Sequence, residues 1–244
     1  MQCVEITEDD EAEIDVNVAT EKSFKLKVNG VRITTFFVSP QELKELATGF
    51  LLCEGNVWSP DEIVSIQVRD DSIVCDIGMD THRLKQWDMH GNRKDIRPIS
   101  STVCFERKAI FGAIEELKER GTSWRRTGGT HSSIVCSPTG EMIAFSEDVS
   151  RACSVDKVVG KAVLCGINPV DCMLATTGRL SATMVAKAAR AGFPLIASKA
   201  APLSEGIRLA EKVGMSLVAF ARKPNLYVYA GEQRVVRSCI STQR

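Results

Sequence analysis

The sequence predicts an α/β protein with a mixed, largely parallel sheet, preceded by a small α+β unit. Two observations predict this class. After about residue 130, short apolar segments alternate with segments of helical periodicity, and strands joined by crossover helices usually pair in parallel and are covered on both faces. Before about residue 80, alternating apolar and charged residues flank an Asn-Gly pair, with one helical segment nearby. The 244 residues are enough for both parts.

The first half is expected to form an acidic, peripheral tail over residues 1–16 and then the α+β unit over 17–100. Asn29-Gly30 lies between two alternating runs. This pair is the strongest short hairpin signal, because both residues of such a turn must accept positive φ. Two further strands are expected over 63–68 and 72–77.

Two helices are expected before the second half begins. Residues 39–42, Ser-Pro-Gln-Glu, are typical of a capping box with Pro at the first helical position. Apolar residues follow at helical spacing from Leu43, and Gly55 can end that helix. A polar connection over 79–101, a type of segment that is often functional, leads to a second helix over 105–120.

The α/β domain is expected to span 101–244. After the helix over 105–120, a hairpin covers 132–136 and 141–146, and a helical pattern follows over 148–164. In such a domain the carboxyl ends of the parallel strands share one edge, where α/β proteins bind ligands. The remaining order is strand, helix, strand, helix, strand, strand, over residues 172–176, 181–191, 194–198, 204–213, 217–220 and 226–230.

Composition argues against several classes of function. Lys and Arg number 31 and Asp and Glu number 31, and this neutral balance argues against a nucleic-acid or membrane-surface binder. The sequence has no run of 18 apolar residues, so we expect no transmembrane helix. The acidic N-terminus does not resemble a signal peptide, and a cytoplasmic location is expected.

The nine cysteines are irregularly spaced and form no C-x-x-C pair. In a chain without a leader, this pattern indicates reduced thiols and not a disulfide framework. The closest pair, Cys165 and Cys172, does not match a zinc-ligand pattern. Most of the cysteines stand in apolar segments, where Cys is commonly a small core residue. We therefore expect no metal site.

Cations stand beside Gly, Ser or Thr in most loops expected at the ligand-binding edge. Backbone amides at helix N-termini and guanidinium groups suit phosphates and other oxyanions. The alternative is that the glycines mark turns and the cations are solvated surface groups. Because several such loops share one edge, we favour a large anionic ligand there. The loops are 125–131, 147–151, 176–181, 198–204 and 220–225.

His131 stands in the first of these loops. A single histidine is more typical of a hydrogen-bonded structural residue than of a catalyst. Its position beside Arg125 and Arg126 makes a functional role more plausible.

Several ordered motifs resemble those of one known family. Between about residues 15 and 236, the pattern is similar to that of the FdhD/NarQ family of formate dehydrogenase accessory proteins. The motifs are Val28–Gly30, Leu46–Gly55, Arg126–Ser132, Glu147–Arg151 with Asp156-Lys157, Thr177–Ser181, Ser198–Pro202 and Phe220–Arg222.

The resemblance implies a sulfur carrier or sulfurtransferase that receives sulfur from a cysteine desulfurase. It implies binding of the molybdenum cofactor in its bis-molybdopterin guanine dinucleotide form, for sulfuration before insertion into the catalytic subunit of formate dehydrogenase. It also implies a three-layer α-β-α domain like that of cytidine deaminase, and a homodimer.

The resemblance also implies which residues bind the cofactor. They come from the loops described above and lie between Arg126 and Asn225. They are Arg126, Thr127, Gly128, Gly129, His131, Asp148, Arg151, Gly178, Arg179, Ser181, Ser198, Lys199, Phe220, Ala221, Arg222, Lys223, Pro224 and Asn225.

The sequence departs from the family at its C-x-x-C motif. By alignment, Ser101 takes the place of the first cysteine and Cys104 that of the second. Cys104 is the expected nucleophile, because the start of the following helix would favour the thiolate. A single thiol can carry a persulfide but cannot release it by forming an internal disulfide.

Two alternatives remain beside the persulfide carrier. One is a non-catalytic chaperone of the same fold that only binds the cofactor, since the departure falls on a residue of the reactive motif. The other is a zinc-dependent nucleobase deaminase, suggested by the fold alone. Deaminase chemistry needs H-x-E and P-C-x-x-C at successive helix starts, and neither pattern occurs at 147–151 or 177–181.

Overall fold

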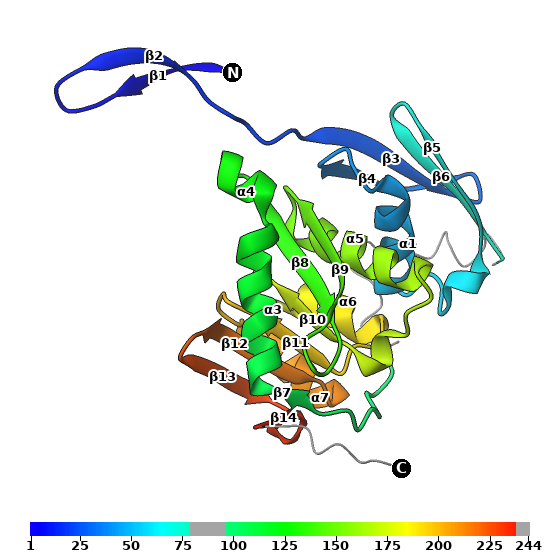
Figure 1. Ribbon diagram of the computed structural model, residues 1–244. Helices are drawn as coiled ribbons and strands as arrows, with labels where there is room; N and C mark the ends of the chain where they lie inside the picture. Colours follow the sequence, from blue (N-terminus) through cyan, green and yellow to red (C-terminus); the bar gives the residue numbers. More distant parts are fainter. Residues whose placement is uncertain (79–95, 238–244) are drawn as a thin grey trace.

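A six-stranded sheet forms the centre of the protein (Figure 1). The computed structural model describes residues 1–78 and 96–237. The strand order is β13-β12-β11-β10-β8-β9, and only β10–β11 and β11–β12 pair in parallel. The strands are β8 (His131–Cys136), β9 (Met142–Asp148), β10 (Met173–Thr176), β11 (Leu195–Ser198), β12 (Ser216–Arg222) and β13 (Asn225–Ala230).

The mixed α/β class is confirmed, but within the six-stranded sheet parallel pairing is confined to β10, β11 and β12. Tight turns explain two of the three antiparallel pairs in this sheet, and the third is β8 with β10. β8 and β9 form one hairpin and β12 and β13 form another, and strands joined by a tight turn must be antiparallel.

Helices cover both faces of this sheet, which gives the expected three layers (Figure 1). On one face α3 (Arg107–Arg120) buries Ile110, Ala113 and Leu117 against inward residues of the sheet. On the other face lie α5 (Arg151–Leu164), α6 (Ala182–Arg190) and α7 (Ser204–Val213). Successive strand residues alternate between the two cores, as the pleat of a strand requires.

The smaller unit contains a four-stranded sheet of order β4-β3-β6-β5 and the helix α1 (Leu43–Cys53). The expected turn at Asn29-Gly30 is confirmed, with φ of 47° and 80°. Its core also takes in Cys153 and Val163 of α5, so the two parts of the chain share apolar packing. The strands are β3 (Lys22–Val28), β4 (Val31–Val38), β5 (Ile63–Arg69) and β6 (Ser72–Ile77), with a short 3-10 helix η1 (Pro60–Glu62) before β5.

α1 and α5 cross with their backbones in contact. A Cβ atom on Gly49 would lie 1.7 Å from the Asp156 carbonyl oxygen, and one on Gly160 would lie 1.9 Å from the Glu45 carbonyl oxygen. Beside this crossing, Lys187 of α6 lies 2.8 Å from Asp156 and 2.7 Å from Glu54. Because neither glycine has a side chain, α1 of the smaller unit can pack directly against α5 of the large domain.

We expect Gly49→Ala to lower the free energy of unfolding by about 3 kcal/mol, because the new methyl group collides with backbone that cannot move aside cheaply. Chemical denaturation followed by circular dichroism measures this loss. Gly112→Ala in α3 is the matched control, since a methyl group added there would meet no heavy atom within 4 Å beyond the backbone of its own helix. The control should be neutral or stabilising by up to about 1 kcal/mol. Equal effects of the two substitutions would contradict the tight crossing.

The N-terminal segment differs from the expected tail. It forms a hairpin of β1 (Gln2–Ile6) and β2 (Glu11–Asp15), which extends away from the rest of the molecule (Figure 1). Its seven carboxylates leave it strongly acidic, and most of its residues are exposed. It is peripheral, as expected, but structured.

The expected capping box before α1 is wrong. Glu42 precedes the helix with φ of 55° and provides no side-chain cap. The Ser39 hydroxyl instead accepts the Val149 N–H at 3.3 Å, and its carbonyl accepts the Lys157 ammonium at 2.9 Å. These partners are more than a hundred residues away, so local sequence could not reveal them. A capping box does occur at Ser59–Glu62, where Ser59 and Glu62 satisfy each other's backbone N–H groups.

Three boundaries around the predicted site also differ. Residues 105–106 are the strand β7 (Phe105–Glu106), which pairs in parallel with β14 (Val235–Val236), and α3 begins only at Arg107. A short helix, α4 (Thr122–Thr127), replaces the first part of an expected loop. β9 continues through Asp148, and α5 begins at Arg151 with Ser150 as its N-cap. Short 3-10 helices η3 (Pro169–Asp171) and η4 (Glu232–Arg234) complete the fold.

Candidate functional site

The loops predicted to bind an anion do meet at one edge of the large sheet. The register pairs the start of β8 with the end of β9, at His131 and Asp148. It also pairs the ends of β10 and β11, at Thr176 and Ser198. The turn between β12 and β13 lies at the same edge, because β11 and β12 run in parallel. We call this side of the sheet the carboxyl edge.

A cavity of about 280 Å³ opens at the carboxyl edge. Four of the predicted residues line it: Gly128, Gly129, His131 and Lys199. Sequence reasoning missed Lys118 and Trp124, because they lie on helices α3 and α4 and not in loops that follow strands. In the sequence, the only signal was a tryptophan directly before two arginines. The other lining residues are Leu117, Thr130, Ser132, Val149 and Thr177.

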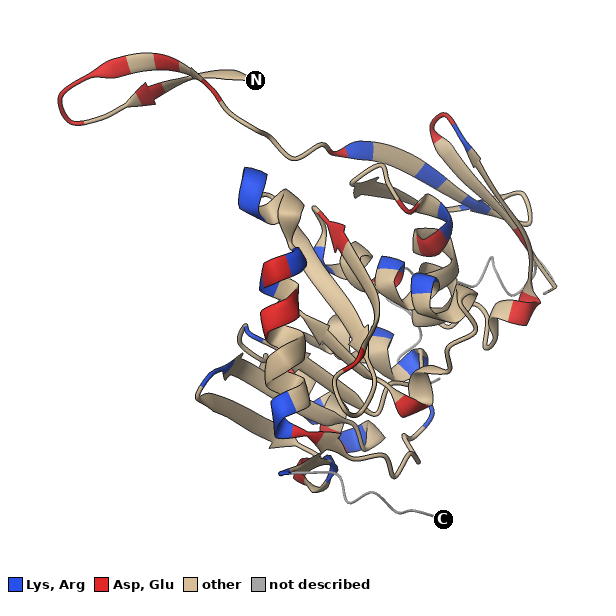
Figure 2. Ribbon diagram, viewed as in Figure 1, with Lys and Arg blue, Asp and Glu red and all other residues tan. Residues whose placement is uncertain are grey.

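Positive charge surrounds this cavity. The Lys199 ammonium lies 5.3 Å from the centre of the Trp124 ring. Burial lowers the pKa of Lys199, and the nearby charges of Arg222 and Lys118 lower it further. Basic residues also mark the end of α4, whereas the N-terminal hairpin is acidic (Figure 2). The electrostatics therefore favour an anionic ligand at the carboxyl edge.

His131 is held as a neutral side chain at this cavity. Its Nδ1 lies 3.1 Å from the Thr177 hydroxyl, which also accepts the Ser132 N–H at 3.0 Å. Burial lowers the pKa of His131, and the charges of Arg151 and Lys199 lower it further. A neutral imidazole with its proton on Nε2 satisfies the Thr177 contact and leaves one N–H donor for a ligand.

We expect His131 to titrate below the ordinary histidine value of 6.5. Because its pKa is lowered in the folded state, its contribution to stability declines as pH falls below the unfolded value. NMR titration of the imidazole nitrogens measures the midpoint directly. Lys199→Gln removes one repelling charge and should raise that midpoint, whereas Arg208→Gln on exposed α7 should leave it unchanged. A midpoint at or above the ordinary value would contradict this electrostatic description.

Three of the predicted cofactor-binding residues have side chains that are buried and held by contacts within the protein. The Asp148 carboxylate is fully buried, 2.6 Å from the Lys157 ammonium, and accepts N–H groups of Ser39 and Ser150. The Ser198 hydroxyl donates to the Gly178 carbonyl at 2.7 Å and accepts the Ala200 N–H. The Ala221 side chain lies in the core against α3. The Asp148 and Ser198 side chains therefore hold the backbone of the loops at the carboxyl edge in place.

Other predicted residues belong to the loops of the carboxyl edge but do not line the cavity. Arg126, Arg179 and Arg222 are exposed at the edge. Arg151 packs over Gly178, where an added Cβ would lie 3.0 Å from the Arg151 Cβ. Ser181 caps α6 by accepting the Met184 N–H at 3.4 Å. We call this set the rim of the carboxyl edge.

The remaining predicted residues end α4 or form the β12–β13 turn. The Thr127 hydroxyl closes α4 by donating to the Ser123 carbonyl at 2.7 Å. Phe220 packs edge-on against Tyr227, with ring centroids 6.1 Å apart. Lys223 lies 2.8 Å from Glu115 of α3, so its charge is engaged away from the cavity. Pro224 and Asn225 are exposed in the turn.

The expected nucleophile lies at the opposite edge of the sheet. The Ser101 carbonyl accepts hydrogen bonds from Arg234, which also donates to the Gly214 carbonyl just before β12. The Ser101–Cys104 segment therefore lies near the amino end of β12. The turn that joins β12 to β13, at the carboxyl end of β12, belongs to the carboxyl edge. β12 has seven residues, which at about 3.3 Å per residue separates the two edges by roughly 20 Å. The structure does not bring Cys104 to the loops of the carboxyl edge.

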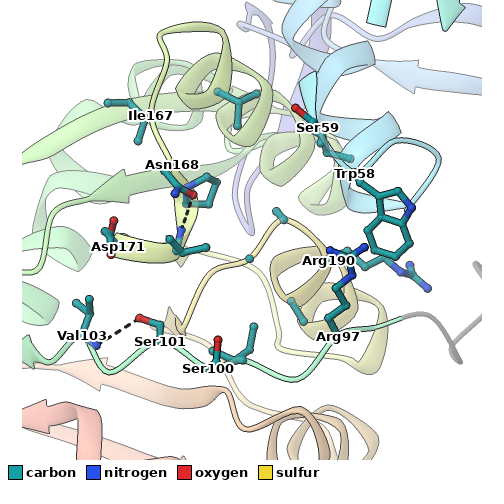
Figure 3. Close-up of a pocket in the computed structure, with 18 of the residues that line it drawn as sticks. Trp58, Ser59, Arg97, Ser100, Ser101, Val103, Ile167, Asn168, Asp171 and Arg190 are labelled. Atoms are coloured by element: carbon teal, nitrogen blue, oxygen red, sulfur yellow. Dashed lines mark hydrogen bonds between the residues drawn. The ribbon is translucent and has the colours of Figure 1, made fainter. Parts of the chain in front are cut away.

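A larger cavity, of about 810 Å³, lies beside this segment. Ser100 and Ser101 form part of one wall, and Asn168 and Asp171 lie across from them (Figure 3). At the other end, the Arg97 guanidinium lies 4.1 Å from the centre of the Trp58 ring. Ser101, the position aligned with the missing cysteine, therefore faces open space. Most of the polar connection at 79–101 lies outside the described residues.

Cys104 does not stand at a helix start, so the helix argument for its thiolate is wrong. The strand β7 separates it from α3. Its Sγ lies 3.7 Å from the Thr102 carbonyl and 3.8 Å from the Gln233 carbonyl, and the residue is half-buried.

Most other thiols are less suited to reaction. Burial raises the pKa of Cys75, Cys136 and Cys153 to about 12 and that of Cys172 to about 11. Burial also raises the pKa of Cys53. Cys3 and Cys165 are exposed, and Cys239 lies outside the described residues. Cys104 is therefore a partly accessible thiol next to a large cavity.

Comparison with known proteins agrees with the motifs. The model of the FdhD/NarQ family matches residues 19–236. This chain belongs to the FdhD/NarQ family. A crystal structure of a protein assigned as a formate dehydrogenase accessory protein in Desulfotalea psychrophila superposes with a TM-score of 0.85 at 28% identity. The superposition covers 97% of this chain and 98% of that one. The resemblance inferred from the motifs is thereby confirmed.

Curated relatives in the FdhD/NarQ family carry the name sulfur carrier protein FdhD. The protein from Methanothermobacter thermautotrophicus is 34% identical over 238 residues, covering 94% of this chain and 95% of its own. The protein from Bordetella bronchiseptica is 30% identical, covering 90% of this chain and 87% of its own. The similarity therefore runs through both parts of the fold.

Two other features bear on the alternatives. Within residues 1–78 and 96–237, no three His, Cys, Asp or Glu side chains come together in a way that could hold a metal ion. The zinc site of a deaminase is thus not found in the described part of this FdhD/NarQ family member. None of the described helices is both long and apolar enough to cross a membrane.

Proposed function

We propose that this protein is a sulfur carrier that accepts persulfide sulfur on Cys104 from a cysteine desulfurase. It would deliver that sulfur to the molybdenum cofactor, in its bis-molybdopterin guanine dinucleotide form, for maturation of formate dehydrogenase. The observation that carries the proposal is the partly accessible Cys104 at the position of the reactive motif, in a chain of the FdhD/NarQ family. The names of the relatives support the sulfur-carrier role.

The loading step is a thiol–persulfide exchange. The Cys104 thiolate attacks the outer sulfur of the donor persulfide, and a new S–S bond forms on Cys104. The S–S bond of the donor breaks, and its cysteine leaves as a thiolate that takes up a proton. No oxidant or reductant is consumed, because one S–S bond replaces another.

Release of that sulfur as sulfide needs two electrons from a thiol. In a C-x-x-C motif the neighbouring cysteine could supply them by forming a disulfide. Ser101 cannot do so. We therefore infer that a low-molecular-weight thiol outside the Ser101–Cys104 pair attacks the inner sulfur, forms a mixed disulfide with Cys104 and expels sulfide.

The cofactor is the substrate that we assign to the carboxyl edge. Its guanine dinucleotide arms carry phosphates, and Lys199, Lys118 and the rim arginines supply matching charge. Gly128 leaves the backbone open to close approach, because a Cβ atom there would meet nothing within 4 Å. His131 offers a hydrogen bond at the same cavity. A homodimer in the cytoplasm is part of this proposal.

The second candidate is a chaperone that binds the cofactor without carrying sulfur. Ser101 in place of a motif cysteine is the observation that favours it. One experiment separates the candidates: incubation with a desulfurase and cysteine, followed by intact-mass spectrometry. A carrier gains about 32 Da, one sulfur atom, on Cys104. A protein that binds GDP but gains no sulfur is the chaperone.

A further inference from the structure

Among the described residues, the N-terminal hairpin pairs with no other strand. β1 and β2 form a two-stranded sheet of their own, which projects from the body of the protein (Figure 1). Val4 and Ile6, alternate residues of β1 that share one face, are both exposed to solvent. A two-stranded hairpin by itself is marginally stable in water. The hairpin therefore has the features of an element that another surface completes.

The charge of the hairpin narrows the choice of that surface. Residues 1–16 carry seven carboxylates and no Lys or Arg side chain. None of the ion pairs found among residues 1–78 and 96–237 involves these carboxylates. Like charges on neighbouring strands repel one another. A cationic surface would therefore stabilise the hairpin.

The carboxyl edge is such a surface. Two lysines line its cavity, and four exposed arginines stand on α4 and in the loops of this edge. None of the six is paired with a carboxylate of the described part of the chain. The neutral net charge of the chain thus hides an anionic hairpin and a cationic edge. The six cations are Lys118, Lys199, Arg125, Arg126, Arg179 and Arg222.

The segment that joins β2 to β3 passes the cavity of the carboxyl edge. A Cβ atom added to Gly129, which lines this cavity, would lie 2.9 Å from the Ala19 Cβ. The hairpin thus begins beside the carboxyl edge, but within one copy it extends away from the molecule (Figure 1). A two-fold axis close to this point places each hairpin at the carboxyl edge of the other copy. Its five-residue strands are about 17 Å long, enough to lie across the ends of four neighbouring strands.

We propose that the N-terminal hairpin docks on the carboxyl edge of a second copy of this chain, with its carboxylates against the cations around the cavity. This inference rests on the homodimer and the anionic ligand of the proposed function, and it is independent of sulfur transfer by Cys104. The hairpin and the phosphates of a ligand use the same cations, so they compete. The docked hairpin lowers the affinity for GDP, and bound GDP weakens the docking by the same factor.

Carbodiimide cross-linking tests the contact directly, because this reagent joins a carboxylate to a lysine ammonium that touches it. Isotope-labelled and unlabelled protein are mixed at low concentration, concentrated and treated, and peptide mass spectrometry identifies the links. We expect links of mixed isotope between residues 1–16 and Lys118 or Lys199, reduced about fivefold by saturating GDP. Links within one chain only, links to Lys22 or Lys27 of β3 instead, or no links would overturn the inference.

Reversal of two hairpin charges tests the competition. Glu8→Lys combined with Glu11→Lys should tighten GDP binding about fivefold and weaken dimerisation about fivefold, because each change replaces attraction by repulsion. Calorimetry and analytical ultracentrifugation measure the two effects. Glu141→Lys combined with Glu211→Lys is the matched control, since both side chains are exposed and the net charge changes equally. The control should stay within about twofold of the wild type. Equal effects in the two double variants, or none in either, would overturn the inference.

GDP binding by the wild type separates this inference from the proposed function. Links of mixed isotope without any GDP binding would overturn the assignment of the cofactor to the carboxyl edge and support the docking of the hairpin. GDP binding without such links would overturn the docking alone. Links that persist at full strength with GDP bound would overturn the competition for the same cations.

Discussion

Cys104→Ala should abolish the sulfur adduct of about 32 Da that forms with a desulfurase and cysteine, because the thiolate is the attacking species. The alternative thiols are poor candidates for physical reasons. Burial raises the pKa of Cys75, Cys136 and Cys153 to about 12. The two exposed thiols, Cys3 and Cys165, stand on the N-terminal hairpin and after α5, away from the segment of the family motif. Intact-mass spectrometry followed by peptide mapping locates the sulfur.

Cys165→Ala is the matched control, and it should take up sulfur at the wild-type level. Persistent uptake by Cys104→Ala would place the nucleophile elsewhere. GDP binding should survive in Cys104→Ala, because Cys104 lies about 20 Å from the carboxyl edge along β12. This independence lets sulfur loading and cofactor binding be measured separately.

GDP, a probe for one end of the cofactor, should bind at the carboxyl edge, and Lys199→Ala should weaken that binding by about 1.5–3 kcal/mol, the usual range for a charge-assisted hydrogen bond. Lys199 lines the cavity, is partly buried, and lies where other cations reinforce the attraction for phosphate. Arg179→Ala should have a smaller effect than Lys199→Ala, because Arg179 is exposed at the rim. Isothermal titration calorimetry measures both changes.

Lys223→Ala provides the control of equal charge change. Its ammonium is paired with Glu115 and lies outside the cavity, so GDP affinity should change by less than about threefold. No GDP binding by the wild type would contradict the assignment of the carboxyl edge. Equal losses in Lys199→Ala and Lys223→Ala would indicate only a general effect of net charge.

The proposed sulfur-loading site and the proposed cofactor site lie at opposite ends of the strands of the large sheet. Sulfur loaded at Cys104 would lie near the amino end of β12, beside the larger cavity. The anion-binding cavity lies at the carboxyl edge. The sheet separates them in a single copy of the chain. Sequence motifs gave no sign of this separation, because both sets of residues belong to the same family pattern.

Local sequence determined much of the fold. Asn29-Gly30 predicted its turn because few other residue pairs accept two positive φ values. Apolar runs alternating with helical patterns predicted the three layers, since such elements must bury their apolar faces against one another. The same alternation predicted which loops share the carboxyl edge, and Gly128, Gly129, His131 and Lys199 line a cavity there.

Only the tertiary structure decided how distant polar groups are paired. Asp148 looked like a ligand contact, yet Lys157 and the Ser39 backbone occupy its oxygens in the core. Ser39 looked like a helix cap, yet it bonds to residues more than a hundred positions away. Arg234 gave no local signal, yet the fold brings it to the Ser101 carbonyl, 133 residues away in the sequence. Propensity and periodicity act over a few residues, whereas a buried charge takes whichever partner the packed fold brings within hydrogen-bond distance.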